Sequence, residues 1–484
     1  MIICERDNCC GCGLCKSQCP CNAIEMVPDQ EGFMYPEVNE SKCVSCEKCK
    51  QICPVLKSIK KEEAIEVSQN QLPEIYSAYK ENLEELLKSS AGGVANSIGE
   101  AVIKAGGVVF GVRYQSDYRG ACFDVARNKE ELDRFNESKY VESNRAYLFE
   151  RLSEEVASGK KVLVIGLPCD IAAVKSLMGD PDNLYTCKLV CRSNTSRKAL
   201  EEFIDNCEQD ADSTVKKISL RFKEAGRPTL PTKYRMEFEN GVIRTGDFTK
   251  SDYGKAFQIL ARPSCFTCAA KAVNNLADIT IGDFQGVTAD SPLAKINGVS
   301  LVCVHTQKGQ NLLSATDNLC LNKVDAEITW KYNWMIYTSI PKSPFRDGFS
   351  EGFIREGLRT ACSCLCEEQN KILDQIKDEY LESDKPVAVW GAGDTTEYLF
   401  DRLEMEKWNI ISIYDGSKMK IGRKFRHHIV EDIKSIKDRR NEIDTLIIMI
   451  PSEDEIKLER ELNKYGWNGK MIHVGKYKFY REEV

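Results

Sequence analysis

Apolar runs and helical stretches alternate along most of this chain, and the alternation predicts an α/β protein. Residues 107–112 and 161–166 are short apolar runs of the kind that form buried strands. Apolar positions recur at helical spacing in residues 81–105, around a break at residues 89–93, and again in residues 145–158. Helices and strands in this order predict a sheet with helices packed on its faces.

The same alternation resumes after residue 384, where it predicts a second, smaller sheet. A strand at residues 387–390 runs directly into Gly391-Ala392-Gly393, and a helix follows through residue 407. Further strands are predicted at residues 410–414, 445–450 and 470–474, with a helix over residues 453–465. This unit of about 100 residues has the pattern of half a Rossmann-like parallel sheet.

Two stretches without a sustained apolar period separate the predicted domains. Residues 57–73 are rich in Lys, Glu, Gln and Ser and are typical of a linker or a short helix, and a cysteine-bearing connector follows residue 344. The length of 484 residues also suggests about three domains. We therefore expect a multidomain α/β chain with domains at residues 1–58, 74–345 and 384–484.

Composition narrows the setting in which this protein works. The first residues lack the charged and apolar regions of a signal peptide, and no run of 18 apolar residues occurs, so we expect a cytoplasmic protein with no membrane span. The net charge of −7 argues against nucleic acid as a partner. Because thiols stay reduced in the cytoplasm, the 23 cysteines indicate metal ligation and not disulfides.

Eight of the cysteines form two runs of identical spacing at the start of the chain. Each run reads Cys-x-x-Cys-x-x-Cys-x-x-x-Cys-Pro, the pattern of bacterial two-cluster ferredoxins. Three thiolates on one short loop reach three irons of a 4Fe-4S cubane, and the fourth ligand comes from the other run. One predicted cluster therefore has Cys9, Cys12, Cys15 and Cys53 as ligands, and the other has Cys19, Cys43, Cys46 and Cys49.

A disulfide framework and a zinc ribbon are the alternatives for these runs. Zinc sites use two separated Cys-x-x-Cys pairs that close on one ion, and the cysteine triplets here crowd that geometry. Cys4, Cys10 and Cys21 fit neither run. We interpret them as small packing residues near the clusters.

Four cysteines of the middle region lie at predicted strand ends or in loops. They are Cys169, Cys191 and the close pair Cys265 and Cys268. Two single cysteines and one Cys-x-x-Cys pair are able to converge on one cubane. Isolated cysteines are more often buried packing residues, so spacing alone leaves both interpretations open.

Several short motifs follow one another in order through residues 75–345. They are Ser90-Ala91-Gly92-Gly93, Ser-Lys-Tyr-Val-Glu-Ser at residues 138–143, Leu167-Pro168-Cys169, and the blocks at residues 265–271, 278–284 and 297–300. In these motifs the chain resembles the coenzyme F-420 hydrogenase/dehydrogenase beta-subunit family. The resemblance implies a flavoprotein that binds FAD beside a third 4Fe-4S cluster, with Cys169, Cys191, Cys265 and Cys268 as the cluster ligands.

The same resemblance implies where FAD binds. Paired glycines at the start of a helix let backbone N–H groups approach a phosphate, and the second motif offers a hydroxyl, a charge and an aromatic face. Without the resemblance, a helix cap with a tight turn is the simpler explanation of the glycines. The predicted flavin-binding residues are Ser90, Gly92, Gly93, Ser138, Lys139 and Tyr140.

One position departs from the family pattern. Many relatives have Cys-His-Gly where this chain has Cys191-Arg192-Ser193, and no histidine occurs before His305. Arg192 does not donate a proton at neutral pH, although it can stabilise an anion or a reduced flavin. No catalytic acid or base is therefore assigned.

The C-terminal unit carries an incomplete nucleotide-binding motif. Gly391 and Gly393 would form the tight turn, and Asp415 at the end of the next predicted strand would accept from a ribose hydroxyl. The third glycine of the motif is replaced by Thr396. Nucleotide binding and a purely structural role both remain open.

Together these features predict an iron-sulfur flavoenzyme that couples hydride transfer at FAD to one-electron transfer through 4Fe-4S clusters. Its hydride partner would be coenzyme F-420, a nicotinamide or an organic substrate, with ferredoxin as the one-electron partner. Two alternatives remain open. One is an electron-transfer subunit of a partner enzyme, and the other is a redox enzyme of bacterial cell-surface polysaccharide synthesis.

Overall fold

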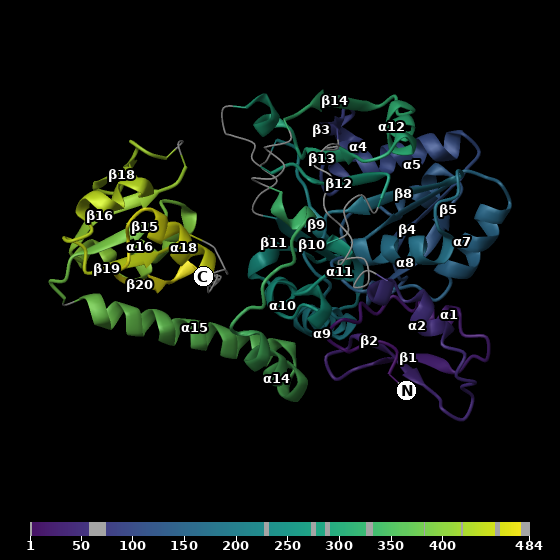
Figure 1. Cartoon of the computed structure of the whole chain (residues 1–484), viewed down its shortest axis with the longest axis horizontal. Helices are drawn as coiled ribbons and strands as arrows, with labels where there is room; N and C mark the ends of the chain where they lie inside the picture. The colour runs from purple at the N-terminus through teal and green to yellow at the C-terminus, as the bar shows by residue number, and fades with distance from the viewer. Residues whose placement is uncertain are drawn as a thin grey trace. The chain divides into compact units, whose positions relative to one another are not determined.

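The computed structural model describes residues 2–57, 74–226, 232–272, 277–285, 291–325, 333–381, 383–417, 420–450 and 455–475. The chain divides into two compact units. The first comprises Met1–Ile340 with Phe353–Arg359, and the second comprises Pro341–Gly352 with Thr360–Val484. Apart from Lys57, the predicted linker at residues 57–73 lies outside the described residues. Figure 1 shows the elements of each unit.

The N-terminal segment has the arrangement expected of a two-cluster ferredoxin. Strands β1 (Ile24–Pro28) and β2 (Met34–Val38) form an antiparallel hairpin between the two cysteine runs. Short helices α1 (Leu14–Ser17) and α2 (Lys48–Ile52) pack against each other, and each contains the third cysteine of its run. Both helices start from a left-handed residue, Gly13 and Glu47, which turns the chain sharply around the cysteines.

A mixed nine-stranded sheet forms the centre of the first unit. The spatial order is β14-β3-β13-β12-β8-β7-β4-β5-β6, and the neighbours β12, β8, β7 and β4 are parallel. The predicted strand at residues 161–166 corresponds to β7. The strands are β3 (Glu74–Lys80), β4 (Val108–Tyr114), β5 (Ala121–Ala126), β6 (Ser143–Asn144), β7 (Val162–Gly166), β8 (Leu184–Leu189), β12 (Ile279–Asp283), β13 (Ser300–Val304) and β14 (Leu319–Lys323).

Helices cover both faces of this sheet, as the alternation of elements predicted. On one face, α5 (Val94–Lys104), α6 (Lys129–Asp133) and α12 (Gln307–Ser314) pack on residues such as Leu163. On the other face, α7 (Leu148–Ala157) and α8 (Pro168–Met178) pack on residues such as Val164. Successive side chains of a strand point to opposite faces, which explains why a continuous apolar run is buried on both sides.

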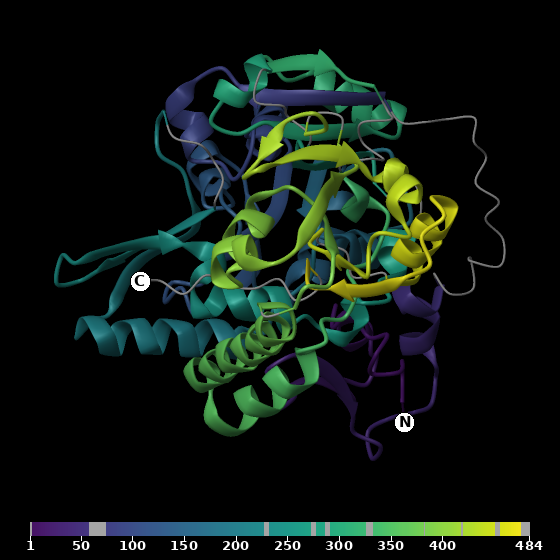
Figure 2. The same cartoon turned by 90° about the vertical axis from the view of Figure 1, so that its left-hand side faces the viewer.

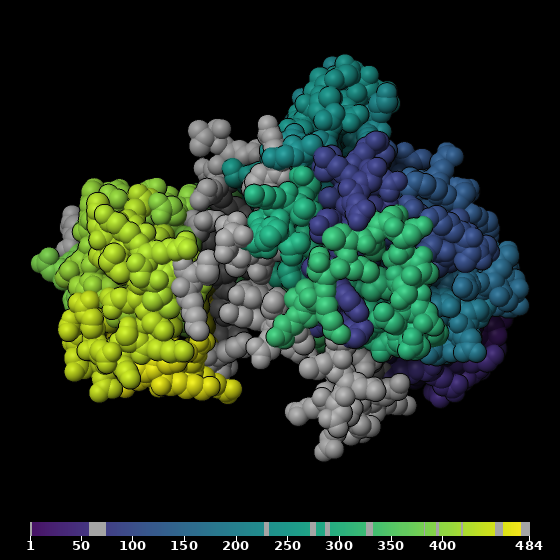
Figure 3. Space-filling view, turned by 90° about the horizontal axis from the view of Figure 1, so that it is seen from above, coloured from purple at the N-terminus to yellow at the C-terminus, as the bar shows by residue number. Residues whose placement is uncertain are grey.

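The ferredoxin segment is part of the same core. Cys12 and the fully buried Leu14 pack with α7 and α8 in the second of these apolar layers. Ser176 of α8 donates to the carbonyl of Ile52 at 2.6 Å, and Lys57 donates to the carbonyl of Ser176 at 3.2 Å. In the space-filling view the purple segment lies directly against the blue surface of the middle region (Figure 3).

Helix α4 (Leu83–Leu87) follows β3, and helix α9 (Arg197–Ala211) follows β8. Directly after α9 comes a second, three-stranded antiparallel sheet. It has the order β11-β10-β9. Helix α10 (Asp252–Ile259), two short 3-10 turns and α11 (Ala269–Ala272) then return the chain to the central sheet. The strands are β9 (Val215–Phe222), β10 (Lys233–Phe238) and β11 (Ile243–Asp247), and the turns are η1 (Phe248–Lys250) and η2 (Pro263–Cys265).

The second unit has the predicted Rossmann-like sheet, which faces the viewer in green and yellow in Figure 2. Its order is β17-β18-β16-β15-β19-β20, with all neighbours parallel except β17 and β18. Numbered along the chain, the five parallel strands have the order 3-2-1-4-5, which is the Rossmann order. They are β15 (Val387–Trp390), β16 (Ile410–Asp415), β18 (His428–Asp432), β19 (Thr445–Ile448) and β20 (Lys470–His473), and β17 is Lys424–Phe425.

Helices complete this second unit. Helix α16 (Asp394–Arg402) follows the glycine turn and α18 (Glu455–Lys464) lies between β19 and β20, close to the predicted positions. Helices α14 (Arg346–Glu356) and α15 (Leu358–Leu381) precede the sheet, although Phe353–Arg359, at the end of α14 and the start of α15, belong to the first unit. Helix α17 (Ile436–Arg439) follows β18. Within the described residues, no helix combines the length and apolarity needed to cross a bilayer.

Candidate functional site

The structure brings the two ferredoxin cysteine runs together in a crossed arrangement. Cys15 and Cys49 are buried in one small apolar cluster, and Cys19 packs against it. Cys9 and Cys53 lie within electrostatic range of Cys15. Cys43 and Cys46 lie within the same range of Cys49. Cys49 lies within the same range of Cys15, so the division of the eight cysteines into two ligand sets stays a prediction.

The environment of these thiols determines when they ionise. Burial raises the pKa of Cys9 to about 11 and that of Cys15 to about 12. A hydrogen bond from the Cys4 thiol lowers the pKa of Cys53 to about 6. Because iron binds thiolates, the buried thiols must release their protons when a cluster is assembled.

A single metal ion makes a different geometric demand from a cubane. No group of three or more His, Cys, Asp or Glu side chains within the described ranges is arranged to hold one metal ion. In a cubane each thiolate binds a different iron, so the four sulfurs do not converge on one point.

The four cysteines predicted for a third cluster line one small cavity of about 40 Å³. Cys169 is the second residue of α8, directly after β7, and Cys191 follows the carboxyl end of β8. Cys265 ends the turn η2 and accepts a hydrogen bond from the Asn194 amide at 3.4 Å. Cys268 lies just before α11. The tertiary structure therefore gathers these four thiols from three separate segments.

Two buried cations border the same cavity. Lys271 and Arg262 both line its wall, and their side chains are 4% and 1% exposed. Cations beside a cluster offset the negative charge of its thiolates. The sequence analysis assigned neither residue a role, although Lys271 ends the motif block at residues 265–271.

A larger pocket of about 400 Å³ lies at the carboxyl ends of β7, β8 and β12. This edge is where open α/β sheets bind their ligands, and the volume suits a small-molecule site. The predicted residue Gly92 does not line the pocket, and a Cβ there would meet the Ala78 carbonyl oxygen at 2.0 Å. The predicted flavin-binding residues on the pocket wall are Ser90, Gly93, Ser138, Lys139 and Tyr140.

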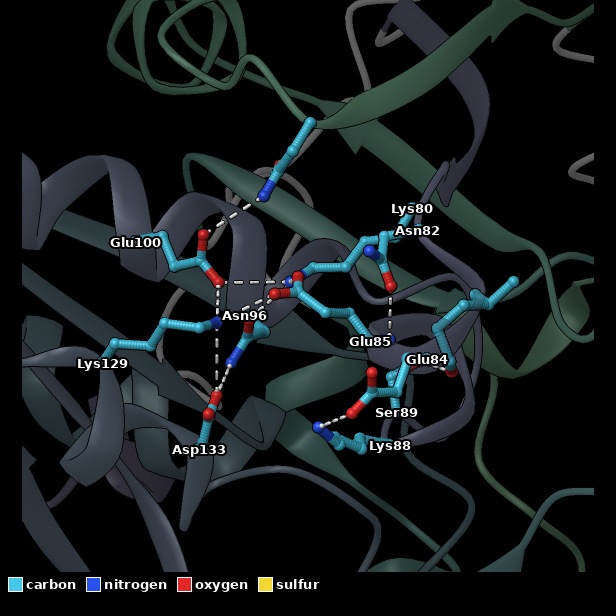
Figure 4. A network of polar contacts seen from close by, with 12 residues as sticks. Lys80, Asn82, Glu84, Glu85, Lys88, Ser89, Asn96, Glu100, Lys129 and Asp133 are labelled. Atoms are coloured by element: carbon cyan, nitrogen blue, oxygen red, sulfur yellow. Dashed lines mark hydrogen bonds and ion pairs between the residues drawn. The ribbon is translucent and has the colours of Figure 1, made fainter.

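A buried polar network holds the start of helix α5 beside this pocket (Figure 4). Lys80 is 2% exposed, and its ammonium donates to Glu85 at 2.6 Å, to Asn96 at 2.7 Å and to Glu100 at 3.2 Å. Gly93 caps the helix with φ +82°, and a Cβ there would come within 2.9 Å of the Lys80 side chain. The glycine is therefore required by both the backbone and the packing.

Lys139 has a structural role that its sequence position did not reveal. Its ammonium donates to the carbonyls of Phe135 at 3.0 Å, Asn136 at 2.5 Å and Glu137 at 2.9 Å. Burial lowers the pKa of Lys139 to about 7. All three of its donors thus hold the loop that precedes Tyr140, and a contact with a pyrophosphate stays a prediction.

Arg221, Asp283 and Phe257 also line the pocket, and the sequence analysis assigned none of them a role there. Arg221 lines the wall and donates to Asp283 at 2.8 Å, at the end of β12. The ring of Tyr140 packs against Phe257, with ring centroids 4.6 Å apart. These residues meet because the folded sheet and helix α10 bring distant parts of the chain together, which no local sequence pattern shows.

The small cavity and the larger pocket share a wall. Cys191, Arg192 and Asn194 line both of them. Arg192 donates to the carbonyl of Gln258 at 3.1 Å. A group in the pocket and a cluster in the cavity would therefore be separated by little more than the loop after β8.

The glycine turn of the second unit is held by Asp415. One carboxylate oxygen of Asp415 accepts from the Ala392 amide at 2.9 Å and from Lys420 at 3.0 Å, and the other accepts from the Ser417 amide at 2.8 Å. Gly391 has φ +117°, whereas Gly393 is extended and precedes α16. The predicted binding residues thus lie together at the strand order's switch point, where Asp415 also stabilises the turn.

Comparison with known proteins gave two family matches. Residues 8–56 match the 4Fe-4S dicluster domain, and residues 159–327 match the C terminus of the coenzyme F420 hydrogenase/dehydrogenase beta subunit. A search of curated proteins found no match.

Solved structures match parts of this chain at low similarity. One is a chain of the F420-reducing NiFe hydrogenase complex from Methanosarcina barkeri, which is 21% identical, with a TM-score of 0.38, over 62% of this chain and 94% of that chain. Another is RSP in complex with beta-NADH, which is 19% identical, with a TM-score of 0.17, over 32% of this chain and 76% of that chain.

The family matches confirm the resemblance that the motifs predicted. Residues 8–56 are a 4Fe-4S dicluster domain, and residues 159–327 are of the type found at the C terminus of the F420 hydrogenase/dehydrogenase beta subunit. The chain is therefore an iron-sulfur redox protein.

Proposed function

We propose that this protein is an iron-sulfur flavoenzyme that couples hydride transfer in the large pocket to one-electron transfer through three 4Fe-4S clusters. The observation that carries the proposal is the shared wall at Cys191, which lines both the four-cysteine cavity and the pocket. A bound FAD would exchange electron pairs with a hydride donor or acceptor and single electrons with the cluster beside it.

The residues of the chain fit both groups. Four thiols from separate segments line the cavity, which is the donor set that a cubane requires. In the pocket, Ser90 and Ser138 lie together with their hydroxyl oxygens 2.9 Å apart, next to the start of α5. A helix start and paired hydroxyls are suited to a phosphate group.

The pocket also contains groups that can act on bound reactants. Arg192 would stabilise negative charge on a reduced flavin, since a guanidinium keeps its charge at neutral pH. The Arg221 and Asp283 pair at the end of β12 would orient a polar substrate. Coenzyme F-420, a nicotinamide and an organic acceptor are the candidate hydride partners, and ferredoxin is the candidate one-electron partner.

Metal and flavin quantitation tests this proposal directly. After anaerobic purification we expect about twelve irons and one FAD per chain, since each cubane holds four irons. Cys169→Ala and Cys265→Ala should each lose about four irons and keep the two ferredoxin clusters. A wild-type protein with only eight irons, or without flavin, would contradict the proposal.

A second candidate is an electron-transfer subunit that has no substrate of its own. It is favoured by the matched family model, which is that of a beta subunit. The two candidates differ in turnover. The flavoenzyme should convert F-420 or a nicotinamide when supplied with reduced ferredoxin, whereas the subunit should be reduced and reoxidised without forming a product.

A further inference from the structure

The four-cysteine cavity has a fifth thiol on its wall, that of Cys10. This residue belongs to the ferredoxin segment and lies between Cys9 and Cys12, which are predicted ligands of the first cluster. Asn8, Pro54 and Val55 of the same segment also line the cavity. The wall of this cavity is therefore formed by the ferredoxin segment and the middle region together.

The contacts of Cys10 extend toward both predicted clusters. Its thiol is hydrogen-bonded with that of Cys12 on one side. On the other side, Cys10 lies within electrostatic range of Cys169. Of the five thiols, four belong to the middle region and already match the ligand number of a cubane.

A buried arginine holds Cys10 in this position. Arg262 is 1% exposed, and it donates to the carbonyl of Cys9 at 2.8 Å and to that of Met34 at 2.6 Å. The same guanidinium donates to Glu142 at 2.8 Å, and Glu142 accepts from the Met34 amide at 3.3 Å. These hydrogen bonds anchor the chain next to Cys10 on the middle region, so the thiol has a defined place on the cavity wall.

We infer that Cys10 is a non-ligating thiol that links the first ferredoxin cluster with the third cluster. The inference rests on the proposed function, since it requires a cluster in the four-cysteine cavity. A thiol has one hydrogen, so with a third cluster in place the S–H group would turn from Cys12 and donate to a sulfur of that cluster, where it would stabilise the reduced, more negative form. Transfer of one electron between the two clusters would leave every covalent bond of Cys10 unchanged.

Two substitutions test the inference in the full-length, anaerobically purified protein. In Cys10→Ala the iron content should equal that of the wild type, because no ligand is lost. A redox titration followed by electron paramagnetic resonance should show a lower midpoint potential for the third cluster. The loss of one hydrogen bond should shift the electron distribution up to about tenfold toward the first cluster. Cys10→Ser keeps a donor and should restore part of the difference.

Cys207→Ala is the matched control. Cys207 is a buried thiol of α9 that lines neither cavity, so its removal should leave the iron content and all potentials unchanged. Loss of about four irons in Cys10→Ala would overturn the inference by making Cys10 a ligand. An unchanged potential would overturn it by making Cys10 a packing residue. Failure of the proposed function is separate, because the wild type itself would then lack the third cluster.

Discussion

Gly11 illustrates how a single residue can be required by both backbone and packing. Its φ is +66°, and a Cβ there would lie 2.6 Å from both Arg262 and Glu142. Gly13 has a similar φ of +74°, but the nearest atom to its added Cβ, in Met26, is 3.9 Å away. The two glycines therefore separate the conformational cost of an alanine from its steric cost.

We predict that Gly11→Ala destabilises the first unit more than Gly13→Ala does. Both variants lose about 1 kcal/mol from the left-handed backbone. Only Gly11→Ala adds an overpacking cost of about 1–3 kcal/mol. Urea unfolding of the two variants checks this, and equal midpoints would contradict the packing argument.

His305 makes the stability of the first unit depend on pH. Burial, together with the charge of Lys188, lowers the pKa of His305 to about 4. The unfolded chain takes up this proton near the ordinary pKa of about 6.5, so stability is complete above that pH and is lost as the pH falls toward 4. Each pH unit within this window costs about 1.4 kcal/mol.

The matching prediction concerns the slope of stability against pH. The urea midpoint of His305→Gln should fall less between pH 6.5 and 5.5 than that of the wild type, by an amount equivalent to about 1 kcal/mol. The glutamine should also keep a polar partner for Thr280, whose hydroxyl lies 2.8 Å from His305. Parallel slopes in the two proteins would contradict the prediction.

At the scale of elements, one ion pair fastens the β1–β2 hairpin to the central region. Arg262 and Glu142 are 1% and 4% exposed in their side chains, and both bind the backbone of Met34 at the start of β2. Removal of one member of a buried pair leaves the other charge uncompensated, which costs about 3–5 kcal/mol.

We therefore expect Arg262→Leu to loosen the ferredoxin hairpin. Amide hydrogen exchange in β1 and β2 should accelerate, and proteases should cut the segment faster. The double variant Arg262→Leu with Glu142→Gln should recover much of the loss, because it removes a buried carboxylate that would otherwise keep only Arg145, 3.9 Å away, as a charged partner. If amide exchange and proteolysis are as fast in the double variant as in the single one, hydrogen bonds and not charge balance hold the hairpin.

At the scale of the whole molecule, the division into two compact units predicts separate unfolding. Leu446 is fully buried in β19, so Leu446→Ala should destabilise the second unit by about 2–5 kcal/mol. Its loss should be visible in tryptophan fluorescence, since Trp390, Trp408 and Trp467 belong to this unit. The visible absorbance of the clusters should stay unchanged at the same urea concentration, because no predicted iron ligand lies in the second unit.

Leu163→Ala is the reciprocal variant for this test. Leu163 is fully buried in β7 of the first unit, so its loss should lower the stability of the cluster absorbance. The tryptophan signal should change only by the share of Trp330 and Trp334, which belong to the first unit, while the share of the three tryptophans in the second unit stays unchanged. If both signals shift together in both variants, the two units unfold as one.

Local sequence patterns predicted most of the elements because each depends on neighbours along the chain. The apolar run at residues 161–166 became β7, and the glycine turn after residue 390 became the start of α16. Such patterns did not predict contacts between residues that lie far apart in the sequence, or the partners of individual side chains. Lys139 was expected to offer a charge to a ligand, yet its donors bind three nearby carbonyls, a choice that depends on how the loop folds.

By itself, the sequence determined the iron-sulfur chemistry and the α/β class, because ligand spacing and apolar periodicity are local properties of the chain. Only the tertiary structure decided which thiols share a cavity and that this cavity borders the pocket. Arg262 and the Cys9 carbonyl, 253 residues apart, meet because the ferredoxin segment and the sheet bury one common core. The free energy of burying apolar area does not depend on how far apart the residues lie along the chain, so no local sequence pattern reveals this contact.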